Sequence, residues 1–269
     1  SFFTFLAIGV PIAYSIGLSA TLTLLVSIFP MPAFTTMAQR ISTGLDSFAL
    51  LAIPFFVLAG QLMNRGGIAM KLIDFAKVLV GRFPGGLAFV NILANMLFGA
   101  ISGSAAASAS AIGTFMTPRM EKEGYDKSYS TAVNVTSATT GLSIPPSNVL
   151  IVYSLAAGGL SIGALFIAGY VPGILTGLAL AAVAAAIAYR RNYPLAEKVG
   201  LKTGLYKFLD AIPSLGMIIV VIGGIIAGIF TATEAAAIAV VYALILSFIY
   251  RQITVKDLPQ ILLRSVIVS

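Results

Sequence analysis

The chain has 269 residues, of which 59% are hydrophobic and 9% are charged. A soluble domain averages about 25% charged residues, so an ordinary soluble protein is excluded. Cysteine and histidine are absent, which excludes disulfides, thiol chemistry and the commonest proton relay and metal ligand. The net charge of +7 comes from basic residues between apolar runs, where the positive-inside rule places them, so it does not indicate a nucleic-acid partner.

The apolar runs are continuous, whereas the strands of a membrane barrel alternate. They predict an all-α polytopic protein whose surroundings are a lipid bilayer. The first runs cover residues 2–29 and 48–63. Residues 68–82 then predict an amphipathic helix lying in the membrane interface, with a solvated loop helix as the alternative. Its charged face carries Lys71, Asp74, Lys77 and Arg82. We predict that residues 1–82 form scaffold spans and this interfacial arm helix.

The charge-free run of 36 residues at 83–118 cannot be one straight span. It would be about 54 Å long as a helix, against a hydrocarbon core of about 30 Å. We therefore predict a re-entrant hairpin with a first arm over 86–101, a tip at Ser102-Gly103-Ser104 and a return arm to Pro118. Basic residues flank the run on both sides, which predicts that both ends of the hairpin face the cytoplasm.

The charge-free stretch after the hairpin predicts a broken helix over 128–157 and a span over 160–189, so that residues 83–189 form half of a transport domain. Residues 190–210 are basic and predict a cytoplasmic loop. The remaining part, 211–269, contains an apolar run to Tyr250 that is too long for one span, followed by a new apolar segment.

The broken helix is predicted from Pro145 and Pro146, which lie in the middle of an apolar segment. Neither proline donates a backbone hydrogen bond, so the carbonyls of Gly141 and Leu142 lose their helical partners. Within a membrane such carbonyls are tolerated where they line a cavity or bind a ligand, and transporters use them to hold Na⁺. The alternative is a simple proline kink whose carbonyls are satisfied by neighbouring Ser and Thr hydroxyls.

Two groups of small polar residues are candidates for ligand binding. The second half of the broken helix begins near Ser147 and Asn148, and its free N–H groups suit a substrate carboxylate. The hairpin tip at 102–104 offers hydroxyls and carbonyls, and Ser108 on the return arm is a further candidate for substrate binding. The alternative for the hairpin is tight helix packing through small residues spaced four apart, beginning at Gly99.

Glu234 is the ionisable residue deepest in an apolar run, which by default indicates a functional group. However, Thr231 precedes it by three residues, and this spacing predicts a capping box at the start of a helix. No carboxylate, His or Lys lies near the tip or the break, so the pattern favours neutral-oxygen coordination of a monovalent cation, Na⁺ or K⁺. An intramembrane enzyme lacks a nucleophile and a base and is disfavoured.

Six segments together resemble the large membrane subunit of TRAP transporters, the tripartite ATP-independent periplasmic transporters. They occur in the order of the family and cover nearly the whole chain. They are Leu51-Ala-Ile-Pro-Phe-Phe56, Leu62-Met-Asn-Arg-Gly-Gly67, Gly99-Ala-Ile-Ser-Gly-Ser-Ala-Ala-Ala-Ser108, Met120-Glu-Lys-Glu-Gly-Tyr125, Gly141-Leu-Ser-Ile-Pro-Pro-Ser147 and Gly228-Ile-Phe-Thr-Ala-Thr-Glu-Ala-Ala236.

The resemblance implies Na⁺-coupled import of a small organic acid, a sialic acid or a C4-dicarboxylate, across the bacterial inner membrane. It implies a small membrane subunit and a periplasmic substrate-binding protein as partners, and an elevator motion of a transport domain. It also implies two inverted repeats, of which the chain covers the first and, over 211–269, the start of the second. The second hairpin and proline break are expected beyond Ser269. The first sodium site would use Ser102, Gly103, Ser104, Gly141, Ile144 and Pro145.

Two other functions remain open from the residues alone. An ion channel would also use carbonyls, but it would repeat a short filter around a symmetry axis, and the chain has one proline break. A purely structural membrane subunit would tolerate replacement of Pro145 and Ser104.

Overall fold

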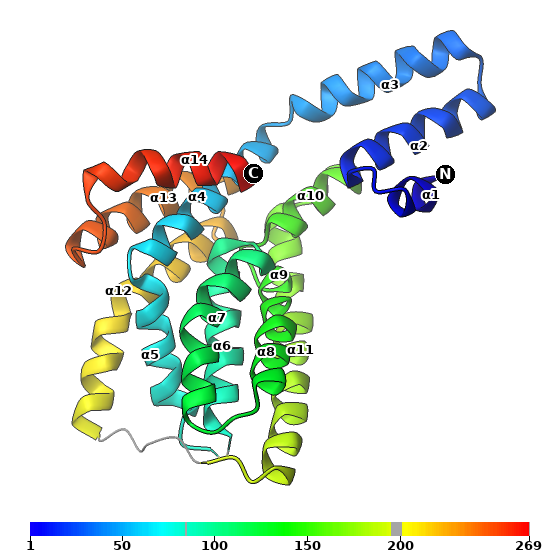
Figure 1. Cartoon of the computed structure of the whole chain (residues 1–269). Helices are drawn as coiled ribbons and strands as arrows, with labels where there is room; N and C mark the ends of the chain where they lie inside the picture. The colour runs from blue at the N-terminus through cyan, green and yellow to red at the C-terminus, as the bar shows by residue number, and fades with distance from the viewer. Residues whose placement is uncertain (84, 195–200, 269) are drawn as a thin grey trace. The chain divides into compact units, whose positions relative to one another are not determined.

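The computed structural model describes residues 1–83, 85–194 and 201–268, and every regular element in these ranges is a helix (Figure 1). The predicted all-α class is confirmed. Part of the predicted basic loop, including Lys198, lies outside the described residues, as do Pro84 in the predicted hairpin segment and the terminal Ser269. The chain divides into two compact units, Ser1–Phe48 and Ala49–Ser269.

The first unit contains three helices, α1 (Phe2–Ala7), α2 (Ile12–Ser27) and α3 (Pro30–Leu45). The predicted first run is therefore split, because Pro11 is the N-cap of α2. Pro30 was expected to close the run, and it also begins α3, where a proline is tolerated because the first N–H of a helix has no partner. Nearly all side chains of this unit are at least partly exposed, as in a helix pair that faces lipid.

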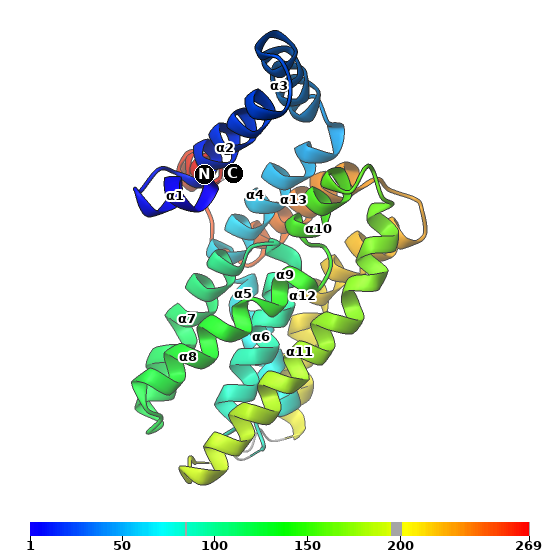
Figure 2. The ribbon, with the colours of Figure 1, turned by 90° about the vertical axis from the view of Figure 1, so that its right-hand side faces the viewer.

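The second unit contains the other helices. Two short 3₁₀ turns precede helices: Phe48–Leu51 comes before α4, and Val255–Asp257 comes before α14. Helices α6, α7, α8 and α11 run side by side (Figures 1 and 2). The helices are α4 (Ala52–Arg65), α5 (Ile68–Val80), α6 (Gly86–Ser102), α7 (Ala105–Lys122), α8 (Lys127–Ala138), α9 (Thr140–Ser143), α10 (Asn148–Ala156), α11 (Ile162–Arg190), α12 (Leu201–Ile226), α13 (Ala232–Ile249) and α14 (Leu258–Val268).

Four helical segments within the described ranges are long and apolar enough to cross a membrane. They are Phe48–Arg65, Ile162–Arg190, Lys202–Ile226 and Ala232–Ile249. Their positions agree with the predicted second run, with the predicted span at 160–189 and with two helices in the long run that starts at 211. Together with the shorter apolar helices α2 and α6, they give the molecule the architecture of a polytopic membrane protein.

Helix α13 packs closely on α4 because its contact face is built of alanines. Small side chains let two backbones approach, which is how helices associate where lipid removes the hydrophobic driving force. The buried alanines of this face are Ala235, Ala236, Ala239 and Ala243. On the other side of α4, α6 contributes to the same core through Phe98, which is fully buried.

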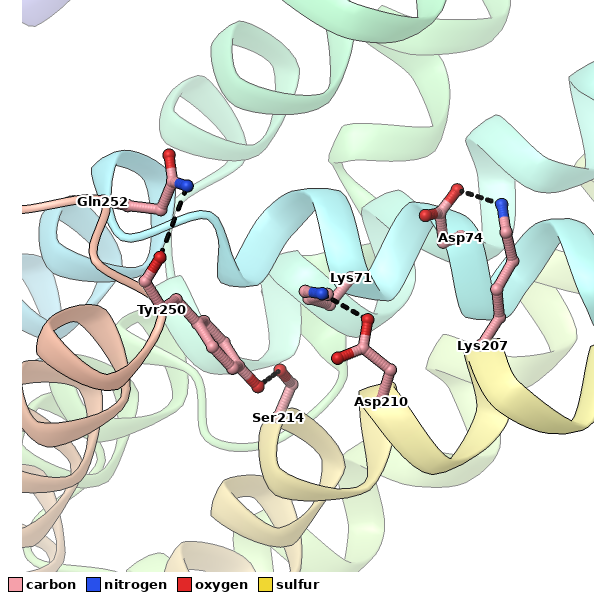
Figure 3. A network of polar contacts seen from close by, with 7 residues as sticks. All are labelled: Lys71, Asp74, Lys207, Asp210, Ser214, Tyr250 and Gln252. Atoms are coloured by element: carbon pink, nitrogen blue, oxygen red, sulfur yellow. Dashed lines mark hydrogen bonds and ion pairs between the residues drawn. The ribbon is translucent and has the colours of Figure 1, made fainter. Parts of the chain in front are cut away.

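The predicted loop at 190–210 is corrected by the structure, because α12 begins at Leu201. Two of its charged residues have partners on α5, which explains why helix continues into this polar segment. Lys207 Nζ lies 3.0 Å from an oxygen of Asp74, and Lys71 pairs with Asp210 (Figure 3). We call these two ion pairs the α5–α12 charge ladder.

Helix α5 confirms a helix within the predicted segment 68–82, and Ile68 and Leu72 of its apolar face are fully buried. Lys77, which was predicted on the charged face, is buried as well, so the two faces are not divided as expected. The charged face of α5 was expected to lie in the membrane interface, but Lys71 and Asp74 of that face contact α12. The Lys71 ammonium also lies 5.3 Å from the ring centre of Tyr250, which follows α13.

The loop between α7 and α8 is held to the end of α11 by stacked tyrosines. The ring centres of Tyr125 and Tyr193 are 4.5 Å apart, and the Tyr125 hydroxyl donates to the carbonyl of Pro194. Burial raises the pKa of Tyr125 to about 12, so its hydroxyl stays protonated and keeps this donor at physiological pH. These contacts therefore hold the loop between the predicted hairpin and the predicted broken helix in place.

Candidate functional site

The predicted hairpin is present. Helix α6 ends at Ser102, Gly103 takes a left-handed conformation with a φ of 60°, and α7 begins at Ala105. Glycine adopts this conformation without steric cost, which allows the chain to reverse within two residues. The Gly103 N–H donates to the carbonyl of Gly99 at 2.8 Å, and Ser104 caps α7 by accepting from the N–H of Ala107. The return arm continues through Pro118 to Lys122, four residues beyond the predicted end.

The predicted break is also present. The backbone is extended at Ile144, and α10 begins after Ser147, close to where the second half-helix was predicted. A short helix, α9, separates α8 from the break, and this extra interruption at Thr139 was not predicted. The peptide bond between Pro145 and Pro146 is cis.

The two carbonyls freed by the prolines differ. The Leu142 carbonyl accepts a hydrogen bond from the Ser147 hydroxyl, so its expected lack of a partner is corrected. A serine five residues later replaces the missing backbone donor. The Gly141 carbonyl accepts no hydrogen bond from any group that the structure describes. The break thus leaves one unpaired carbonyl, at the glycine that the sequence singled out.

The hairpin and the broken helix meet through glycines. A Cβ atom added at Gly99 would lie 2.6 Å from the Cα atom of Gly141, so the two backbones are in direct contact. A Cβ atom added at Gly103 would lie 2.9 Å from the carboxamide carbon of Asn148. The structure therefore brings the hairpin tip against the start of α10, and the first arm against the turn before the break.

Asn148 has the one buried side-chain atom among the described residues that lacks a hydrogen-bond partner, its Oδ1 atom. This oxygen belongs to a carboxamide packed on the hairpin tip, at the first residue of α10. An unpaired buried acceptor costs free energy unless a cation or a donor completes it. Ser147, the N-cap, does not cap α10 with its side chain, because its hydroxyl is used by Leu142.

The other predicted ion-site residues lie on the hairpin tip and in the break. Ser102, Ile144 and Pro145 are buried, and Ser104 is half-buried. Helix α11 covers the break through a further glycine, since a Cβ atom at Gly173 would lie 2.5 Å from a side-chain carbon of Ile144.

A cluster of amides and hydroxyls was missed by the sequence analysis. Asn95 is its centre: its Nδ2 atom lies 2.9 Å from Ser137 Oγ and 3.1 Å from Asn134 Oδ1. We call the cluster, whose members are between 0% and 6% exposed, the amide cluster. Its members are Asn91 and Asn95 on α6, Ser108 on α7, and Asn134 and Ser137 on α8. Two asparagines one turn apart in a charge-free apolar run were the available signal.

Ser108 was predicted to bind substrate, and the structure places it in the amide cluster. Its hydroxyl donates to Asn95 Oδ1 at 2.7 Å, and the residue is fully buried. Its contact with substrate stays a prediction, and it requires that this hydrogen bond opens. Ser147 and Asn148, the other predicted substrate residues, lie together at the start of α10.

The capping box predicted at Thr231 and Glu234 is confirmed. Glu234 Oε2 accepts from the N–H of Thr231 at 2.8 Å, and the Thr231 hydroxyl accepts from the N–H of Glu234. The carboxylate of Glu234 is therefore used to start α13.

Comparison of the sequence with known proteins identifies the family of the chain. Residues 1–269 match the family described as the tripartite ATP-independent periplasmic transporter, DctM component. The chain belongs to this family. The resemblance to TRAP transporters is thus confirmed, and this family consists of membrane subunits of transporters rather than of enzymes.

One curated relative is the uncharacterized protein YgiK of Salmonella typhimurium. It is 59% identical to the chain over the whole chain, and the matched part is 62% of that protein. The C4-dicarboxylate TRAP transporter large permease protein DctM of Rhodobacter capsulatus is 41% identical over 96% of the chain and 61% of that protein. The sialic acid TRAP transporter permease protein SiaT of Haemophilus influenzae is 38% identical over 93% of the chain and 40% of that protein. The chain spans about three fifths of the first two relatives' length.

Proposed function

We propose that the chain is part of the large permease of a Na⁺-coupled transporter that imports small organic acids. The observation that carries this proposal is the meeting of the hairpin tip with the broken helix, where Asn148 Oδ1 and the Gly141 carbonyl lack partners among the described groups. Unpaired oxygens inside a membrane protein are costly unless an ion binds them. Both belong to neutral groups, which suits a monovalent cation.

The ion ligands are the carbonyls and hydroxyls predicted from the family resemblance, at Ser102, Gly103, Ser104, Gly141, Ile144 and Pro145. Asn148 Oδ1 adds a side-chain oxygen that the sequence analysis had assigned to substrate. Within the described residues there is no group of three or more His, Cys, Asp or Glu side chains that could hold a metal ion, so a transition metal is not favoured. The coordination is expected to be by oxygen alone, as sodium prefers.

The substrate is a small carboxylate, in agreement with the relatives named for C4-dicarboxylate and for sialic acid. The backbone N–H groups at the start of α10, next to Ser147 and Asn148, are oriented to receive its carboxylate. Binding of Na⁺ beside this point adds a positive charge, which strengthens the attraction for an anion and couples the two.

The partners are a small membrane subunit and a periplasmic substrate-binding protein, and the location is the bacterial inner membrane. The matched family is named for a tripartite periplasmic transporter, which supports an assembly of this kind. The fully packed hairpin and broken helix move together in an elevator motion relative to the scaffold, while the exposed apolar side chains of α11 and α12 face lipid or the small subunit.

Uptake in proteoliposomes tests the proposal, with the complete permease, its small subunit and the binding protein, and a panel of labelled carboxylates. We expect uptake to require an inward Na⁺ gradient and to persist when a protonophore removes the proton gradient. Full-rate uptake with K⁺ replacing Na⁺ would refute the coupling. Saturable uptake separates a transporter from a channel, which would instead give single-channel currents.

A further inference from the structure

The amide cluster joins three helices in the interior of the second unit. Asn95 of α6 donates to Asn134 and Ser137 of α8, and its Oδ1 atom accepts from Ser108 of α7. Asn134 completes the connection by donating to the carbonyl of Ala109 on α7 at 2.8 Å. These four contacts cross from one helix to another, whereas the bond from Asn95 to Asn91 stays within α6. The cluster therefore holds both arms of the hairpin to the helix before the break.

The amide cluster needs no ligand. Among the buried side-chain atoms that the structure describes, the unpaired one is on Asn148, outside the cluster. A fully satisfied buried network strengthens its own hydrogen bonds and fixes one arrangement of the surrounding helices. The contribution of the amide cluster is therefore to geometry.

The geometry that the cluster fixes is that of the candidate site. Asn95 lies four residues before Gly99 on α6, and Ser137 lies four residues before Gly141. The contact between Gly99 and Gly141 therefore lies four residues beyond the cluster both on α6 and in the segment that follows α8. A Cβ atom at Gly141 would also lie 3.3 Å from the carbonyl oxygen of Asn95.

We propose that Asn95 is a positioning residue for the ion site. By tying α6 and α7 to α8, it sets the distance between the hairpin tip and the broken helix, and with it the spacing of the oxygens contributed by each. This inference rests on the proposed function for the identity of the ligand. The positioning itself is measurable without any ligand.

The test compares three substitutions that remove polar groups from the same region. Asn95→Ala removes the centre of the cluster, and Ser137→Ala removes one acceptor of Asn95. Ser130→Ala is the matched control, because Ser130 is also a fully buried serine on α8 whose hydroxyl donates within its own helix, to Asp126. Ser137→Ala is a small change that keeps the test open if Asn95→Ala does not fold.

The first readout is a distance in Na⁺-free buffer. The 269 residues contain no cysteine, so in a permease whose remaining part is also free of cysteine, cysteines introduced at the exposed positions Ala106 and Val149 carry spin labels on α7 and α10 without background. We expect a narrow distance distribution in the otherwise unchanged permease and in Ser130→Ala, and a broader one in Asn95→Ala and Ser137→Ala. Equal distributions in all four proteins, or broadening in Ser130→Ala as well, would overturn the proposal.

The second readout is the Na⁺ concentration that gives half of the maximal thermal stabilisation, with K⁺ keeping the ionic strength constant. We expect roughly a fivefold increase for Asn95→Ala, at the low end of coupling between linked sites, a smaller increase for Ser137→Ala and none for Ser130→Ala. An unchanged half-point in Asn95→Ala contradicts the positioning role. A permease without any Na⁺ response, but with the expected broadening, keeps the positioning role and refutes the proposed ion.

Discussion

Two helix junctions of the second unit are held by opposite kinds of polar contact. At the amide cluster, neutral amides and hydroxyls join α6, α7 and α8, and Asn95 is completely buried. At the α5–α12 charge ladder, two ion pairs join α5 to α12, and their side chains are between 29% and 31% exposed. Neutral groups thus lie where water is excluded, and charges lie where water still reaches them.

The difference follows from the cost of removing each group from water. Burial removes the hydration of an ion pair, and the attraction between the charges offsets this free-energy cost only when their geometry is ideal. A buried neutral amide needs only its hydrogen bonds. Amides are also directional, so they fix distances. The charge ladder instead fixes direction: Lys71 pairs with Asp210 and Asp74 with Lys207, and this order is possible only when α5 and α12 are antiparallel.

The largest effect is expected where the neutral junction depends on direct backbone contact. Gly99→Ala should lower the free energy of unfolding by about 3 kcal/mol, because the new Cβ atom meets the Gly141 backbone, which has no side chain to move aside. Gly223→Ala on α12 is the control, since nothing lies within 4 Å of its Cβ position. Chemical unfolding of both variants measures the difference. Equal stability would mean that the crossing is looser than described.

Removing an amide should come next. Asn134→Leu removes the oxygen that accepts from the Asn95 amide and the N–H group that donates to the Ala109 carbonyl, which should cost about 1–3 kcal/mol and be insensitive to salt. Thr136→Val, on the exposed side of the same helix, removes a hydroxyl that bonds within α8 and serves as the control. Unfolding at low and at high salt checks the prediction. A strong salt dependence would argue against a dry, neutral junction.

Breaking the charge ladder should change the free energy of unfolding by less, and this change should depend on salt. Lys71→Asp should cost up to about 1 kcal/mol at low salt, and the double variant Lys71→Asp with Asp210→Lys should recover part of it. Added salt should reduce the difference, because partly exposed charges are screened. A double-mutant cycle of unfolding free energies measures the coupling. No recovery in the double variant would mean that packing, not charge, joins the helices there.

The smallest effect concerns Asp257, a carboxylate held by neutral donors. Hydrogen bonds from the hydroxyl and the N–H of Thr254 lower the pKa of Asp257 below its ordinary value of 3.8. Its contribution to stability is therefore complete above pH 3.8 and is lost as the pH falls through the folded-state pKa. Thr254→Val should flatten this part of the stability curve between pH 5 and pH 2. If the free energy of unfolding of Thr254→Val falls with pH as in the unchanged protein, the Thr254 hydroxyl does not determine the pKa of Asp257.

The hairpin, the proline break and the capping box were predicted from the sequence because each depends on local chemistry. Gly103 permits the reversal, Pro145 and Pro146 remove backbone donors, and the spacing of Thr231 and Glu234 defines a cap. These features need no knowledge of what lies across the fold.

The remaining features depend on partners far apart in the chain. Lys207 could be recognised as helical only with Asp74 beside it, so the segment from Leu201 was predicted as loop. Asn95 pairs with groups on two other helices, and its spacing of one turn from Asn91 does not reveal which groups these are. The Ser147 hydroxyl completes the carbonyl of Leu142, which is only five residues earlier, but it was predicted as a substrate ligand because the spacing does not show which way a hydroxyl at the break points.

The contact between Gly99 and Gly141 also limits how the hairpin can move. Sliding α6 along its axis by one turn would bring the side chain of Asn95 toward a gap that holds only two backbones. The crossing therefore fixes the height of the hairpin tip along the broken helix, so any motion of the hairpin that keeps this contact also keeps the register between Gly103 and Asn148.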